Sequence, residues 1–152
     1  MLRDAALALA GCLLLIGCGP NKPECAQPHA DFQVLIKFAN RALPPDTVVH
    51  VTYGGSGTED YRLADPGHQE VVFCEPADAE GNELDASSAV EGSAGEGNSA
   101  PVLALSCALW TGGYSKVEVS GTGVTTTTRD LSPREHVCTL QDEILLDPPD
   151  AG

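Results

Sequence analysis

Residues 32–38 read FQVLIKF, and this stretch decides the fold. Its even-numbered positions are Phe, Val, Ile and Phe, while Gln33 and Lys37 lie between them. Successive side chains of a β-strand point to opposite faces, so a period of two predicts a strand with one strongly apolar face. Such a face must be covered by another layer of the protein.

Similar runs recur on both sides of this strand. We expect further strands at residues 47–53, 61–63, 69–74, 103–110, 114–120, 124–129 and 137–146. Turn residues such as Gly54-Gly55-Ser56-Gly57 and Asp65-Pro66-Gly67 separate them. No segment after residue 18 has a convincing helical pattern. The sequence therefore predicts an all-β protein, a Greek-key-type β-sandwich of about seven to eight strands over residues 31–147, with a tail at 148–152.

The strand at 103–110 has one apolar face, formed by Leu103, Leu105, Cys107 and Leu109. This face is expected to point into the core. Trp110 lies at the end of the strand, beside a Gly-Gly turn. We expect it to pack in the core, and the alternative is a stacking role toward a sugar or a partner protein.

Residues 75–101 differ from the rest of the chain. They contain seven Asp and Glu residues and no Lys or Arg, among many Gly, Ser, Ala and Asn residues. A segment with little apolar content and one sign of charge cannot offset its ordering entropy, which predicts a disordered acidic insertion. A calcium loop is the alternative, although the spacing of an EF-hand loop is missing.

The first 18 residues resemble a bacterial lipoprotein signal, with Leu15-Ile16-Gly17-Cys18 as the lipobox. An apolar run of about 12 residues follows a short basic start and is too short to span a bilayer. The resemblance implies cleavage between Gly17 and Cys18, removal of residues 1–17, and palmitate-type lipidation of Cys18. Residues 18–30 would then be a lipidated tether. Gly19 is not the Asp that retains many lipoproteins at the inner membrane, which favours the outer membrane.

Four other cysteines follow the lipobox, namely Cys25, Cys74, Cys107 and Cys138. An even number of cysteines in an exported chain favours disulfide bonds. Three pairings are open, of which we favour Cys74 with Cys107 and Cys25 with Cys138. The cysteines lack the paired spacing of a zinc site, so no metal is expected.

Residues 109–129 resemble the second half of a carboxypeptidase regulatory-like, or transthyretin-like, domain. The likeness rests on an aromatic after Gly112-Gly113, then Val117-Glu118-Val119-Ser120, a glycine and a Thr-rich strand. It implies a β-sandwich. The layout also resembles small acidic bacterial lipoproteins of undescribed function.

Charge and motifs exclude several activities. Eight Lys and Arg stand against 22 Asp and Glu, a net charge of −14, which repels phosphate backbones and anionic lipid headgroups. The four histidines (His29, His50, His68 and His136) are isolated, and His50 is expected on a solvated strand face. Ser56 lacks the context of a serine nucleophile. No catalytic residue and no cofactor is predicted.

These observations predict a non-enzymatic lipoprotein of the bacterial cell envelope. The lipid on Cys18 would hold it at the membrane, and an envelope protein of unknown identity would be its partner, with no nucleic acid bound. The alternative is a ligand-binding module for carbohydrate or Ca²⁺ that uses loops at the strand ends.

Overall fold

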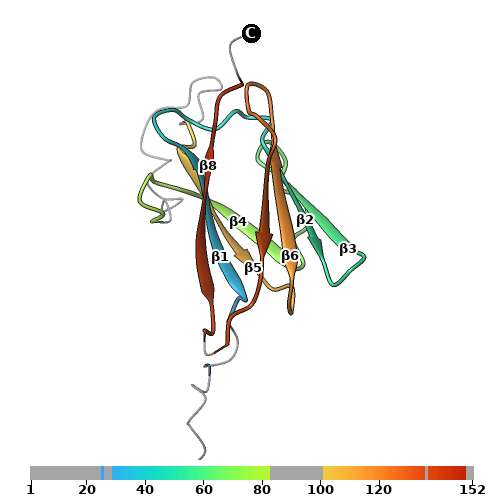
Figure 1. The fold of residues 1–152 in the computed structure, drawn as a ribbon. Coiled ribbons are helices and arrows are strands. Elements are labelled where there is room, and N and C mark those ends of the chain that lie inside the picture. Colours follow the sequence, from blue (N-terminus) through green and yellow to red (C-terminus); the bar gives the residue numbers. More distant parts are fainter. Residues whose placement is uncertain (1–24, 26–28, 83–100, 136, 150–152) are drawn as a thin grey trace, which may run out of the picture.

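A computed structural model describes residues 25, 29–82, 101–135 and 137–149 (Figure 1). These residues form eight strands and no helix. The strands are β1 (Phe32–Phe38), β2 (Val48–Tyr53), β3 (Gly57–Arg62), β4 (Val72–Ala77), β5 (Ala104–Leu109), β6 (Ser115–Ser120), β7 (Thr127–Leu131) and β8 (Leu140–Leu146).

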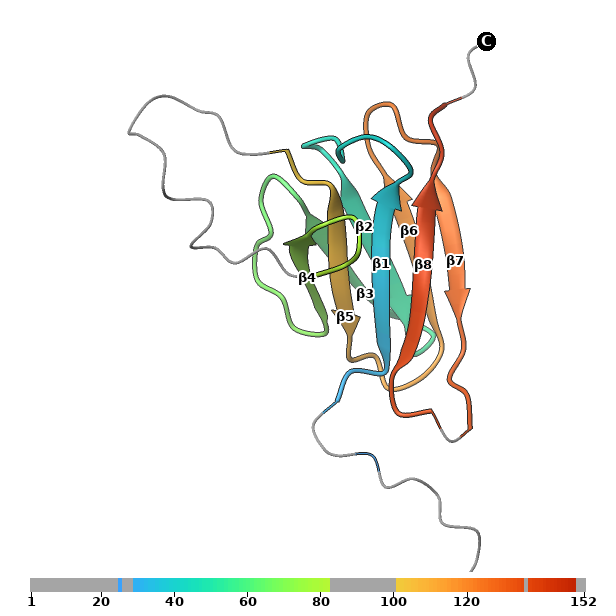
Figure 2. The ribbon, with the colours of Figure 1, turned by 90° about the vertical axis from the view of Figure 1, so that its left-hand side faces the viewer.

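Two four-stranded sheets pack face to face, as Figure 2 shows. The first sheet has the order β4-β5-β1-β8 and the second has the order β3-β2-β6-β7. Neighbouring strands are antiparallel except β1 and β8, which are parallel. Along the chain, β2 pairs with β3 in the second sheet, the chain crosses to the first sheet where β4 pairs with β5, and β6 then returns to the second sheet beside β2 in the manner of a Greek key. The predicted all-β sandwich is confirmed.

The core lies between the two sheets and follows the period-two pattern. Phe32, Val34, Ile36 and Phe38 are all buried, while the residues between them are partly exposed. The opposite sheet contributes the inward residues of β2 and β6, such as Val49 and Val117. Burying one such side chain fully stabilises the fold by roughly 1.5–3 kcal/mol, so these alternating positions hold the two layers together.

The bounds of several predicted strands need correction. The third strand is Gly57–Arg62 rather than 61–63, because the tight turn through Gly54 and Gly55 lets the chain pair at once with β2. Residues 69–71 precede β4, which runs on through Pro76 to Ala77. The last two strands begin later than expected, at Thr127 and Leu140, and Leu103 lies outside β5 and is exposed.

The predicted disordered insertion at 75–101 is wrong at its start. Residues 75–77 belong to β4, and residues 78–82 form a turn closed by Asp78. The Asp78 carboxylate accepts hydrogen bonds from the Asn82 side-chain amide and from the backbone N–H groups of Asn82 and Glu80, which lower the pKa of Asp78. Residues 83–100 lie outside the described residues. Most of the segment for which a calcium loop was the alternative is therefore not described.

Both favoured disulfide pairings are present in the structure. Cys74 and Cys107 face each other across β4 and β5, with their Cα atoms 4.0 Å apart, and both are buried in the core. Cys25 is joined to Cys138, in the segments that lead into β1 and β8. By the chain-entropy model each bond stabilises the fold by about 3–5 kcal/mol.

The two disulfides should differ in their reactivity toward a mild reductant. We expect the Cys25–Cys138 bond, which lies outside the sheets, to be reduced first, while the buried Cys74–Cys107 bond stays intact until the sandwich opens. Alkylation of the native protein followed by peptide mass spectrometry measures both rates. Equal rates for the two bonds would contradict this expectation, and a variant with Cys25→Ser and Cys138→Ser isolates the slow bond as a control.

Candidate functional site

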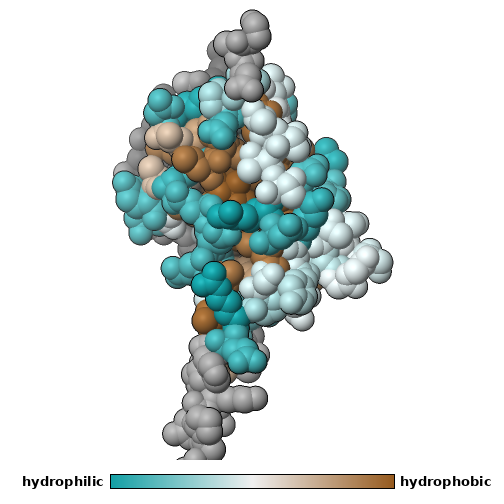
Figure 3. Space-filling view, viewed as in Figure 1, coloured by the Kyte–Doolittle hydropathy of each residue, from teal (hydrophilic) through white to brown (hydrophobic). Residues whose placement is uncertain are grey.

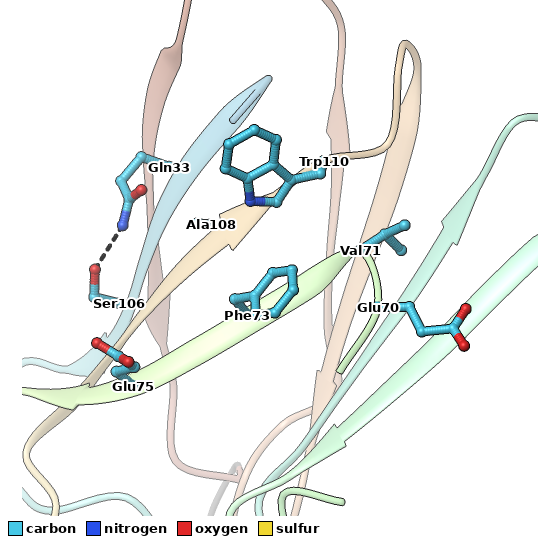
Figure 4. A pocket seen from close by; sticks show the side chains of 8 residues that line it. All are labelled: Gln33, Glu70, Val71, Phe73, Glu75, Ser106, Ala108 and Trp110. Carbon is cyan, nitrogen blue, oxygen red and sulfur yellow. Dashed lines mark hydrogen bonds between the residues drawn. The ribbon is translucent and has the colours of Figure 1, made fainter. Parts of the chain in front are cut away.

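The outer face of the first sheet carries an aromatic groove. Phe73, Ala108 and Gln33 stand side by side on β4, β5 and β1, because Ala108 is the register partner of both others. Trp110 lies two residues beyond Ala108, so its side chain projects from the same face of the sheet. A small residue between two rings leaves a hollow with Ala108 at its floor (Figure 4).

The two rings of this groove are open to solvent. Phe73 is 42% exposed and Trp110 is 38% exposed, so the expected core packing of Trp110 is wrong. Trp110 follows the outward positions of its strand, and the second sheet covers only the inward ones. The groove has a volume of about 710 Å³ and is lined by Gln33, Glu70, Val71, Phe73, Glu75, Ser106, Ala108 and Trp110. Aromatic residues in a concave, partly apolar surface are typical of a binding site.

Polar groups form the sides of the aromatic groove. The Gln33 amide donates a hydrogen bond of 2.7 Å to the Ser106 hydroxyl oxygen, which orients both side chains (Figure 4). The Glu75 carboxylate stands on the same side, because Glu75 is the register partner of Ser106, and the Glu70 carboxylate stands on the opposite side, beyond Val71 (Figure 4). Burial raises the pKa of the Tyr61 phenol behind β4, and the negative charge of Glu75 raises it further.

A second hollow continues the aromatic groove toward β8. It shares Gln33 and Ser106 with the groove and has a volume of about 440 Å³. Its other lining residues are Leu35, Glu80, Gly81, Gln141, Asp142 and Glu143. Figure 3 looks onto the neighbouring edge of the sandwich, at β7 and β8, where hydrophobic residues reach the surface among hydrophilic ones. Together the two hollows make one surface that crosses all four strands of the first sheet.

The 78–82 turn shapes this second hollow by resting on the sheet. Gly81 has a φ of +88°, and a Cβ at this position would lie 3.3 Å from Leu35 Cδ1. Lys37 holds the turn because its ammonium group donates to the Ala79 carbonyl at 2.9 Å. The same ammonium group pairs with the Glu143 carboxylate at 3.0 Å. A glycine is required here both by the backbone conformation and by the close approach.

Glu59 of β3 fixes the entry to β4 and so the edge of the aromatic groove. Its carboxylate accepts backbone N–H groups of Glu70 and Val71 at 3.0 Å each and of Val72 at 3.3 Å. These donors would otherwise be unpaired at an edge of the sheet, because β4 pairs with β5 alone. One side chain therefore links the two sheets and positions Glu70 and Val71.

A separate polar cluster lies on the outer face of the second sheet. His50 Nδ1 is 2.5 Å from an Asp60 carboxylate oxygen, and His50 Nε2 is 3.4 Å from the Thr52 hydroxyl oxygen. Asp60, His50 and Thr52 follow one another as the acid, base and nucleophile of a catalytic triad do. The distance from His50 Nε2 to the Thr52 hydroxyl oxygen is, however, long for a hydrogen bond. The His50 and Asp60 side chains are 43% and 39% exposed. His50 thus occupies the solvated strand face that was expected, and we derive no reaction from this cluster.

The remaining residues singled out in the sequence do not line the aromatic groove. Cys18 and Gly17 lie outside the described residues, as does His136. His68 is exposed and lies 3.8 Å from the Glu70 carboxylate. Within the described part of the chain, no three His, Cys, Asp or Glu side chains are grouped to hold a metal ion. The described residues also include no helix long and apolar enough to cross a membrane.

Comparisons of the chain with protein-family models, curated proteins and solved structures found no match.

The sequence did not predict the aromatic groove. The sequence does indicate that Ser106, Ala108 and Trp110 share the outer face of one strand. It does not indicate that Phe73 and Gln33 lie beside Ala108 on the neighbouring strands, because that depends on the strand register.

The role of Glu59 can be tested with Glu59→Gln. The amide retains one acceptor oxygen and turns an NH₂ group toward backbone donors, so we expect the free energy of unfolding to fall by about 1–3 kcal/mol. Urea denaturation followed by the fluorescence of Trp110, the single Trp of the chain, measures this. Glu118→Gln on the outer face of β6 is the matched control and should change it by less than about 0.5 kcal/mol. Equal effects of the two variants would contradict the assigned role.

Proposed function

We propose that this protein is a non-enzymatic lipoprotein of the bacterial cell envelope that serves as a binding module. The aromatic groove is its binding surface, and an envelope protein is its partner. The observation that carries the proposal is the pair of exposed rings, Phe73 and Trp110, on a rigid sheet face. Aromatic anchors in shallow pockets supply much of the free energy at protein interfaces.

The membrane location rests on the lipobox at residues 15–18. Lipidation of Cys18 with two or three acyl chains would give stable anchoring, whereas one chain would be marginal. Gly19 at the following position favours the outer membrane. The two disulfides support an oxidising compartment, since such bonds persist outside the cytosol. The finer likeness to transthyretin-like domains, carried by residues 109–129, is part of the same proposal.

A carbohydrate ligand is the second candidate. It is favoured by the side-chain amide of Gln33 and the hydroxyl of Ser106 beside the exposed rings, because sugars offer both apolar faces and hydroxyl groups. The groove lies on a sheet face and not on loops at the strand ends. Calcium is a weaker candidate in the described residues, because the Asp78 carboxylate already accepts three hydrogen bonds within its own turn.

The lipid anchor is tested with Cys18→Ser. Without the thiol no diacylglyceryl group can be attached, so we expect the protein to move from the membrane fraction to the soluble fraction. Fractionation of cells and intact-protein mass spectrometry measure the shift and the loss of acyl mass. Cys12→Ser, in the segment expected to be removed, is the control and should leave the protein at the membrane. Retention of the Cys18→Ser variant at the membrane would contradict the anchor.

The binding surface is tested by cross-linking in cells. Benzoylphenylalanine in place of Phe73 keeps an aromatic ring in the groove, and we expect it to form a discrete adduct with one partner. Adding Trp110→Ala should reduce that adduct by about tenfold, as expected for an anchor residue. The same probe in place of Thr128, on the second sheet, is the control. Adducts of equal yield from both positions, or none from Phe73, would refute the groove as the binding surface.

A further inference from the structure

We infer that the occupant of the aromatic groove is a basic, extended segment of a partner protein, with a Lys or Arg side chain stacked on Trp110. This inference rests on the proposed function and specifies the chemistry of the partner. It joins three properties of the same surface: exposed rings, carboxylates beside them and a hollow that continues across the sheet.

The charged residues that line the two hollows are all acidic. Glu70 and Glu75 line the aromatic groove, and Glu80, Asp142 and Glu143 line its continuation. None of the described residues lining either hollow is Lys or Arg. A cluster of one charge on a concave surface concentrates the field and attracts groups of the opposite charge.

Glu70 and Glu75 are the carboxylates that a cationic ligand could pair with, because the acids of the continuation near β8 already have basic partners. In the continuation, Glu143 is paired with Lys37, and Asp142 accepts two hydrogen bonds from the Arg129 guanidinium. Of the described Lys and Arg side chains, none forms an ion pair with Glu70 or Glu75, and Glu70 has only the exposed His68 at 3.8 Å. Glu75 lies two residues beyond Phe73 on β4 and Glu70 lies at the opposite side of the groove, so a cation bound over the rings would have a carboxylate on either side (Figure 4).

Stacking of a cation on an aromatic ring is a contact that this chain already uses. The guanidinium carbon of Arg41 lies 3.8 Å from the centre of the Phe38 ring. Trp is the most favourable ring for such a contact, and its strength grows as the cation loses water. The 38% exposed indole of Trp110 offers the same contact to a side chain from another molecule.

The acidic character of the chain argues against other occupants. A second copy would bring its own net charge of −14 to an acidic surface. Nucleic acids and anionic lipid headgroups would be repelled in the same way. An extended segment fits because the two hollows share Gln33 and Ser106 and form one continuous path over several strands.

The test is a titration of the full-chain protein, solubilised in a nonionic detergent, with defined probes. Trp110 is the single Trp of the chain, so its fluorescence reports on the groove directly. The probes are a hexa-arginine peptide, a hexaserine peptide and maltohexaose. We expect hexa-arginine to change the emission with saturation, and the two neutral probes to leave it unchanged. The affinity should fall between 0.1 and 1 M salt, because the screening length shortens from about 10 to 3 Å.

Matched variants separate the groove from general charge attraction. Glu70→Gln with Glu75→Gln should weaken binding of hexa-arginine about fivefold, as expected for two partly exposed ion pairs. Glu118→Gln with Asp130→Asn removes the same charge from the second sheet and should weaken it less than twofold. Because the single Trp is the reporter in this assay, the Trp110→Ala variant is followed by calorimetry and should lose about tenfold. Thermal unfolding confirms that each variant is folded.

The outcomes distinguish the inference from the proposed function. Equal losses in the two charge variants, or equal binding of hexaserine, would overturn the inference of a basic segment. Binding of maltohexaose in place of hexa-arginine would also overturn it and would leave the groove as a carbohydrate site. No response to any probe would overturn the basic segment alone if the Phe73 cross-link is found. If that adduct is absent as well, both proposals fail.

Discussion

Alternation of side chains along the strands of the first sheet is the constraint on which the rest of the structure depends. The inward residues of β1 make the centre of the core, and its outward residues Gln33 and Leu35 line the hollows of the binding surface. A shift of one residue in register would exchange these faces. The core and the proposed binding surface are therefore two sides of one pattern, and the buried side determines where the exposed side is placed.

Polar side chains pair with the backbone N–H groups that have no partner strand at the β4 edge of the first sheet. The backbone N–H groups before β4 would be unpaired without the Glu59 carboxylate, and the Cys74 N–H donates to the Gln69 side chain at 2.9 Å. Pro76 within β4 also fits an edge strand, because it needs no partner for a missing N–H. These features protect the edge against pairing with another chain. They also hold Glu70 and Val71 at the end of the aromatic groove.

The amino-acid pattern predicted the sandwich, the bounds of β1 and the presence of disulfides, because strand period and Cys count can be read from the sequence, and it left three pairings open, of which the favoured one is present. It failed where pairing across the fold decides the result. Residues 69–71 have strand propensity, but the Glu59 carboxylate accepts the backbone N–H groups of Glu70 and Val71, and β4 begins later. Trp110 was expected in the core because its place at a strand end does not reveal which face the second sheet covers. The groove needed the register of β4, β5 and β1.

The Cys25–Cys138 disulfide connects the fold to the proposed anchor. A tether that was free from residue 19 to residue 30 could span about 40 Å, whereas the seven steps from Cys18 to Cys25 span at most about 25 Å. With a lipid on Cys18, this bond would hold the start of β1 and of β8 close to the membrane. Trp110 lies at the same end of the first sheet, because Asp31 donates its N–H to the Leu109 carbonyl and accepts that of Gly112. The aromatic end of the groove would therefore face the membrane side, and repulsion between the acidic domain and anionic headgroups would help to keep it open for a partner.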